Sequence, residues 1–143
     1  MSRVIFLDGG DDDRGALSRR IARYLDALVA RGARVVLRVD PARAGTWNEF
    51  LWTFDEGAFL PHGVFDGAWP PDEPVTIATG PVPDAASAVV LCVTDAPVEE
   101  LARHETVFEV VDRCSPEGVT RSRARWAAWK EAGHAQEYRK EWT

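Results

Sequence analysis

The sequence contains few of the residues that metal and redox chemistry require. It has two cysteines and three histidines in 143 residues. Cys92 lies inside the apolar run AVVLCV and Cys114 follows a strand-like segment, with neither CxxC spacing nor a histidine cluster beside them. Isolated thiols of this kind are typical of small buried side chains rather than of a disulfide or a zinc site. We therefore predict no metal site and no cofactor.

Long apolar runs are also missing. No window approaches the roughly 18 uncharged apolar residues that a membrane span needs. The start, MSRVIFLDGG, reaches an acidic loop without the positive and hydrophobic regions of a signal peptide. A length of 143 residues with 45% apolar content fits one globular domain over residues 1–143. We expect a cytoplasmic protein, monomeric when isolated and without a membrane anchor.

Positive charge is scarce in most of the chain. Residues 1–120 carry 11 basic and 20 acidic side chains, whereas residues 121–143 carry six basic and three acidic ones. The larger part should repel phosphate groups, so direct binding of nucleic acid is not expected. Only the C-terminal part is suited to attract an anionic partner.

Apolar periodicity predicts strands that alternate with helices. The strand-like runs are at 4–7, 35–39, 75–79, 88–93 and 107–112, with a further edge strand predicted at 134–139. The helical patterns are at 16–30, 41–54, 97–105 and 116–132. This order is typical of a three-layer α/β/α fold with a mostly parallel central sheet. The Pro-rich stretch 68–75 is predicted to be a surface loop.

The loop after the first strand, GGDDDRGAL, has partial features of two kinds of enzyme site. Gly10 and Gly15 have phosphate-loop spacing, but Ala16 and Leu17 stand where the lysine and hydroxyl are needed. The fold is therefore expected to be Rossmann-like without a nucleotide site. An alternative is a Mg-dependent phosphatase-like enzyme centred on Asp8, although the position for a second carboxylate is Gly10. The acidic run 11–13 otherwise suits a helix start.

Two aromatic residues lie outside the predicted core near residue 55. In the helix over 41–54, an apolar stripe occupies an arc of roughly 100°, and Trp52 lies about 140° from its centre. Phe59 follows in the connection LWTFDEGAFLPHG. One interpretation packs both rings under the loop. The other exposes them as an anchor for a protein partner.

The last helix combines aromatic and basic side chains. Val119, Arg123, Trp126 and Lys130 lie within about 60° of one another around the helix axis. The small residues Ala124, Ala128 and Ala132 lie on another side and are predicted to pack against the sheet. The basic stripe would then face outward, either as a solvated face or as a site for an acidic peptide with an apolar end.

Four segments carry a resemblance to a known family. LWTFDEGAFLPHG, PVTIATG, AVVLCV and RARWAAWKEAGH resemble the chi subunit of bacterial DNA polymerase III in order and spacing over nearly the whole chain. The resemblance implies a non-catalytic accessory subunit of the clamp-loader assembly. It also implies two partners, which are the acidic, phenylalanine-ended C-terminal tail of single-stranded DNA-binding protein and the psi subunit.

The resemblance also implies which residues contact each partner. Arg123 and Trp126 match the tail-binding positions, with Trp129 and Lys130 in neighbouring motif positions. The family often has a basic residue directly after that aromatic, and this chain has Ala127, so either the site is weaker or Lys130 supplies the charge. On the other side, Trp52 and Phe59 match the surface that binds psi or, in some members, a helicase.

Overall fold

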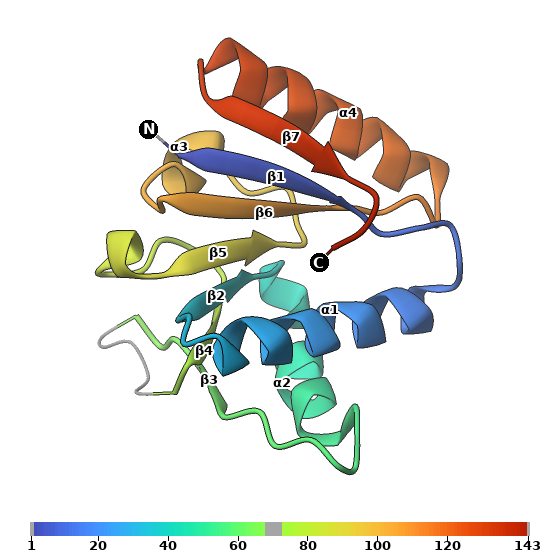
Figure 1. Cartoon of the computed structure of the whole chain (residues 1–143), viewed down its shortest axis with the longest axis vertical. Helices are drawn as coiled ribbons and strands as arrows, with labels where there is room; N and C mark the ends of the chain where they lie inside the picture. The colour runs from blue at the N-terminus through green and yellow to red at the C-terminus, as the bar shows by residue number, and fades with distance from the viewer. Residues whose placement is uncertain (1, 68–72, 143) are drawn as a thin grey trace.

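The computed structural model describes residues 2–67 and 73–142, and the fold is shown in Figure 1. Most of the predicted loop at 68–75 lies outside these residues. In chain order the elements are β1 (Arg3–Asp8), α1 (Arg14–Ala30), β2 (Val35–Arg38), η1 (Pro41–Arg43), α2 (Ala44–Thr53), β3 (His62–Val64), β4 (Val75–Ala78), η2 (Ala85–Ser87), β5 (Val89–Cys92), α3 (Val98–Leu101), β6 (Thr106–Val111), α4 (Pro116–Glu131) and β7 (Ala135–Arg139).

The described strands form one seven-stranded sheet in the order β3-β4-β2-β5-β6-β1-β7. Every neighbouring pair is parallel. Helices α1 and α2 cover one face, and α3 and α4 cover the other (Figure 1). The predicted three-layer α/β/α fold and the edge strand near residue 135 are confirmed.

The alternation of side chains along β1 explains why both faces need helices. Ile5 and Leu7 join the cluster under α1 and α2, whereas Val4 and Phe6 join the cluster under α3 and α4. All four are buried. A strand that is apolar on both faces is typical of a parallel sheet covered on both sides.

One local element was not predicted, and one local expectation is confirmed. No strand was predicted at residues 62–64, which form the edge strand β3 beside β4. Three residues with a central glycine are too short for a period-2 pattern to be visible. The acidic loop does form a helix start, since Asp13 Oδ1 accepts a hydrogen bond from the Ala16 amide at 2.7 Å.

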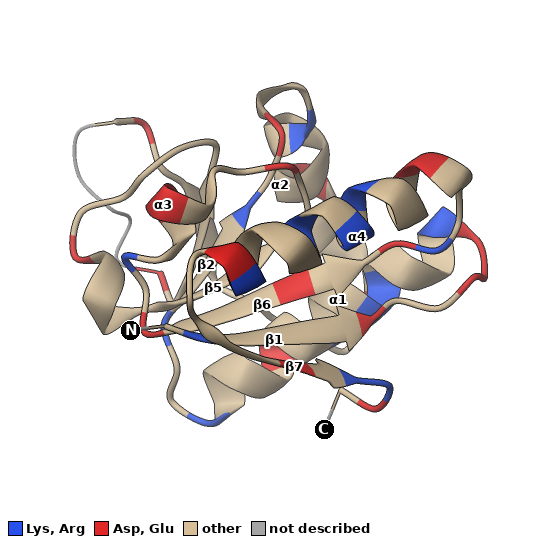
Figure 2. Cartoon of the chain, turned by 90° about the horizontal axis from the view of Figure 1, so that it is seen from above, with Lys and Arg blue, Asp and Glu red and all other residues tan. Residues whose placement is uncertain are grey.

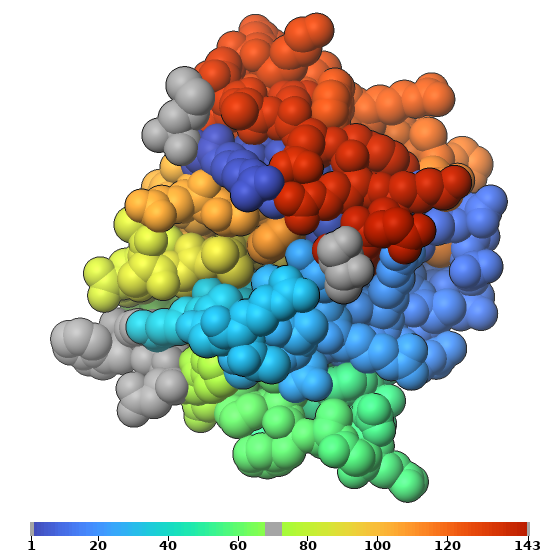
Figure 3. Space-filling model, viewed as in Figure 1, coloured from blue at the N-terminus to red at the C-terminus, as the bar shows by residue number. Residues whose placement is uncertain are grey.

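The C-terminal residues close the α1 face of the sheet. Trp142 is buried, and its Nε1 donates to the Asp8 carbonyl at 2.7 Å. The Arg20 guanidinium lies 4.4 Å from the centre of the Trp142 ring. Figure 3 shows the last residues (red) against α1 (blue) on this face. None of the helices in the described ranges is long and apolar enough to cross a membrane.

Candidate functional site

The orientation of α4 on the sheet is set by a buried ion pair. Arg125 Nε lies 2.8 Å from Glu109 Oε1 on β6, and Arg125 Nη2 lies 2.6 Å from Oε2. Burial alone would lower the pKa of Arg125, but the hydrogen-bonded Glu109 carboxylate raises it well above its usual value. Arg125 therefore keeps its proton, and its contact with Glu109 orients α4 on β6.

The same carboxylate binds a second residue of α4. Trp129 Nε1 donates to Glu109 Oε2 at 2.7 Å, and the indole is fully buried. Gly118 completes this face, because a Cβ there would overlap the Asp112 carbonyl oxygen. At about 100° per residue, Gly118, Arg125 and Trp129 fall within roughly 40°.

This geometry corrects two expectations. The three alanines that were predicted to pack against the sheet are exposed instead; they are Ala124, Ala128 and Ala132. Trp129 was expected to contact a bound peptide, but its 0% exposure places it beneath the helix, out of reach of a surface ligand. The face of α4 that packs on the sheet carries Arg125 and Trp129 instead of small apolar residues, because both side chains donate hydrogen bonds to the Glu109 carboxylate on β6.

Beside this inner face, α4 and the sheet form a shallow groove of about 260 Å³. Trp126 is half-buried in it, and its ring contacts Phe6 edge-on with centroids 4.9 Å apart. The groove is lined by Phe6, Val111, Arg113, Val119, Ser122, Arg123, Trp126 and Tyr138. Figure 2 shows basic positions along α4, whereas α3 on the same side of the sheet is acidic.

The structure thus brings together three of the residues predicted from the sequence. Val119, Arg123 and Trp126 all line the groove. Lys130 and Ala127 are exposed but do not line it.

Sequence reasoning missed the other wall of the groove. Arg113, from the connection between β6 and α4, donates to both oxygens of Asp8, with Nε at 2.9 Å and Nη2 at 3.2 Å. Burial would raise the pKa of Asp8, but hydrogen bonds from Tyr138, Arg113 and the Gly10 amide hold it below its usual value. Burial, followed by the Asp8 carboxylate, raises the pKa of Tyr138 to about 12. No local motif links these positions, which meet only through sheet pairing.

A second accessible surface lies at the opposite edge of the sheet. Trp52 and Phe59 are 55% and 75% exposed, with ring centroids 6.4 Å apart. His62 is buried beneath Trp52 at 4.4 Å between ring centroids, and its ring nitrogens lie 2.7 Å from the Leu60 carbonyl and 3.0 Å from the Asn48 carbonyl. His62 therefore fixes the connection after α2 and supports the exposed indole. The interpretation that both rings fold under the loop is wrong.

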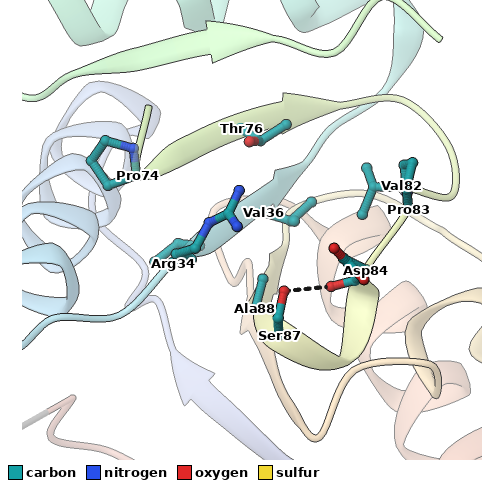
Figure 4. Close-up of a pocket in the computed structure, with 10 residues that line it drawn as sticks. Arg34, Val36, Pro74, Thr76, Val82, Pro83, Asp84, Ser87 and Ala88 are labelled. Atoms are coloured by element: carbon teal, nitrogen blue, oxygen red, sulfur yellow. Dashed lines mark hydrogen bonds between the residues drawn. The ribbon is translucent and has the colours of Figure 1, made fainter. Parts of the chain in front are cut away.

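Two further hollows lie outside these two surfaces. The first, beside β2 and η2, is shown in Figure 4, and its volume of about 20 Å³ holds little more than one water molecule. Another of about 380 Å³ lies at the carboxyl ends of β2, β5 and β6. Two of its arginines, Arg14 and Arg121, already lie 3.5 and 3.9 Å from the Asp112 carboxylate. Its positive charge is largely compensated within the protein.

The arrangement around Asp8 does not favour the phosphatase alternative. The Asp8 side chain is only 8% exposed and is covered by Arg113, which donates to both of its oxygens, so it is poorly placed to attack a phosphate. Within residues 2–67 and 73–142, no three His, Cys, Asp or Glu side chains are grouped so that they could hold a metal ion. In the described part of the chain, accessible aromatic and basic side chains mark the candidate sites of a small α/β protein.

A comparison with models of protein families shows to which family this α/β protein belongs. The sequence model of the DNA polymerase III chi subunit, HolC, matches residues 1–137 of the 143. The chain belongs to this family, and an accessory role in DNA replication follows from membership. A search of curated proteins found no match.

Proposed function

We propose that the chain is a non-catalytic, cytoplasmic adaptor in the polymerase III holoenzyme, with two separate protein-binding surfaces. The groove between α4 and the sheet binds the acidic, phenylalanine-ended C-terminal tail of single-stranded DNA-binding protein. The surface of Trp52 and Phe59 binds the psi subunit or a helicase. The adaptor itself contacts no nucleic acid, and it links the clamp-loader assembly to the protein that coats the template strand.

One observation carries the tail assignment. The groove lining joins an apolar floor of Phe6, Val119 and Trp126 side chains to the basic side chain of Arg123, which is exposed. A phenylalanine side chain suits the floor, and the acidic residues before it suit the cation. The net charge of −6 over the whole chain makes this local arrangement selective, because the rest of the surface repels an acidic peptide.

The test is a fluorescence-anisotropy titration of a labelled peptide that ends in acidic residues followed by Pro-Phe. Arg123→Gln should weaken binding about tenfold or more, since a charge-assisted hydrogen bond contributes about 1.5–3 kcal/mol. Arg34→Gln, which removes the same charge from an exposed site between α1 and β2, should bind like wild type. Added salt should weaken the wild-type interaction. Equal affinity of the two variants would contradict the site.

The second surface is tested by pull-down of psi or the helicase partner. Phe59→Ala should lose the partner and keep the tail peptide, because Phe59 is highly exposed and lies outside the groove lining. Arg123→Gln should show the reverse pattern and therefore serves as the matched control. Loss of both activities in Phe59→Ala would indicate misfolding instead of a docking surface.

A further inference from the structure

The Trp52–Phe59 surface lies in an acidic part of the chain. Residues 44–102 contain ten Asp or Glu residues and no Lys or Arg. This stretch includes α2, β3 and β4, which lie together at one edge of the sheet (Figure 1). The groove beside α4, by contrast, has the basic Arg123 in its lining. The two accessible aromatic surfaces therefore differ in the sign of the charge around them.

Three of these carboxylates flank the two rings. Glu49 lies one turn before Trp52 on α2, and Asp55 and Glu56 lie in the connection between the rings. All three are exposed, and none forms an ion pair with a residue in the described ranges. Charged residues at the edge of an apolar patch commonly face opposite charges on a partner. These carboxylates are therefore accessible to cations of a partner.

The end of α2 adds to the negative potential at this surface. The helix spans Ala44–Thr53, and Phe54 is its C-cap. A helix carries partial negative charge at its C-terminus, which basic residues in the last turn commonly offset. The last turn of α2 contains no basic residue. Because Trp52 lies in that turn, the exposed indole, the carboxylates and the negative helix end occupy one region.

We propose that the Trp52–Phe59 surface selects a positively charged segment of its partner, in which Lys or Arg side chains flank an apolar residue. This inference rests on the proposed function and adds to it the chemistry of the partner. The apolar residue packs on the two rings, and the cations face the three carboxylates. His62 supports the Trp52 indole from beneath, and the indole is 55% exposed, so a cation can also lie against its free face.

Opposite charges on the two surfaces also explain how the chain keeps its partners apart. The carboxylates beside Trp52 repel an acidic tail, and Arg123 in the groove repels a basic segment. Charges at the edge of an interface act mainly on the association rate and on its salt dependence. A basic partner should therefore associate with the Trp52–Phe59 surface faster at low salt than at high salt.

The experiment uses the purified partner, psi or the helicase, that wild type captures and Phe59→Ala loses. Its association and dissociation rates are measured on the immobilised chain at several salt concentrations. The test variant combines Glu49→Gln, Asp55→Asn and Glu56→Gln. Asparagine keeps an oxygen for the Gly57 amide, which donates to Asp55 Oδ1 at 2.9 Å, so the turn is preserved.

The matched control removes the same amount of charge elsewhere. It combines Glu99→Gln on α3 with Glu117→Gln and Glu131→Gln on α4, all at exposed positions on the opposite face of the sheet. The test variant should bind the partner about tenfold more weakly, mainly through slower association, and its affinity should depend less on salt. The control should stay within about twofold of wild type at every salt concentration.

Each other outcome has a defined meaning. A test variant with wild-type affinity, or wild-type binding that does not respond to salt, overturns the proposal. Tighter binding by the test variant indicates an acidic partner and overturns it as well. Equal weakening in the test and control variants assigns the effect to net charge and not to this surface, which also overturns it.

Two further measurements separate the remaining cases. If the test variant has a lower melting temperature, Glu56→Gln alone decides the question, because this exposed side chain forms no ion pair with a described residue. It should slow association about twofold, and an unchanged rate overturns the proposal. A partner that Phe59→Ala still binds would instead contradict the proposed docking surface itself, whatever the charge variants do.

Discussion

Arg125 and Glu109 meet at the centre of the interface between α4 and the sheet, with 2.6 Å between Nη2 and Oε2 and side chains only 7% and 3% exposed. Because the pair is desolvated, losing one partner leaves a buried charge that water cannot reach. Breaking such a pair typically costs about 3–5 kcal/mol.

We expect Arg125→Met to lower the free energy of unfolding, measured by urea denaturation, by about that amount. The matched control is Arg3→Met, which breaks the pair with Glu137 at 2.8 Å on the exposed surface. The free energy of unfolding of Arg3→Met should fall by less than about 1 kcal/mol, since exposed ion pairs contribute little to stability. Similar losses in both variants would contradict the structural role of the buried pair.

Two tryptophans one turn apart on α4 should respond differently to substitution. Trp126→Ala should weaken tail binding at least tenfold and lower stability by about 1 kcal/mol, because its ring packs against Phe6. Trp129→Phe should lower stability by about 1–3 kcal/mol, because Glu109 loses the indole donor, and should leave the affinity of the folded protein intact. Thermal melts and anisotropy titrations check both. A large affinity loss in folded Trp129→Phe would restore it as a contact residue.

The two cysteines should differ in reactivity. Burial, reinforced by Glu109, raises the pKa of the Cys92 thiol to about 12, and the side chain is enclosed beside Arg125. Cys114 is half-buried, and burial followed by Asp112 raises its pKa as well. Because the thiolate is the reactive form, native protein at pH 8 should label slowly and at Cys114. Unfolded protein should label at both, as peptide mass spectrometry can show. Rapid native labelling of Cys92 would contradict the structure.

Acid should destabilise the protein partly through Asp8. Its pKa is lowered in the folded state, so the unfolded state binds the proton more readily, and the contribution of Asp8 is present above a pH of about 4. That contribution is lost as the pH falls through the folded pKa. Asp8→Asn should therefore flatten the fall of stability below about pH 4, measured by urea denaturation at a series of pH values. Asp12→Asn, an exposed neighbour, should keep the wild-type slope.

The order of strands and helices could be predicted from the sequence because apolar periodicity reports it directly. The helical stripe also placed Trp52 off the buried face, but the sequence left open whether Trp52 and Phe59 pack under the loop, and only the structure shows both rings exposed. The short strand β3 could not be predicted, because its pairing with β4 is a tertiary property.

The inner face of α4 was mispredicted for an electrostatic reason. Arg125 was not expected inside, because a buried arginine is stable only when a carboxylate such as Glu109 lies opposite it, and that partner is 16 residues away. The Arg113–Asp8 wall of the groove was missed in the same way, because its two residues are 105 positions apart. Patterns within one element predict which residues are apolar, but they do not report charges on another strand.

The strand order has a mechanical consequence for the proposed adaptor role. The groove lies beside β1 and β7 at one edge of the sheet, and the Trp52–Phe59 surface lies beside β3 at the other (Figure 1). Six gaps of about 4.8 Å between adjacent strands separate these edges by roughly 29 Å. A hydrogen-bonded parallel sheet does not stretch, so it would act as a spacer of fixed length. Two partners could be seated together without touching, and neither would have to leave before the other arrives.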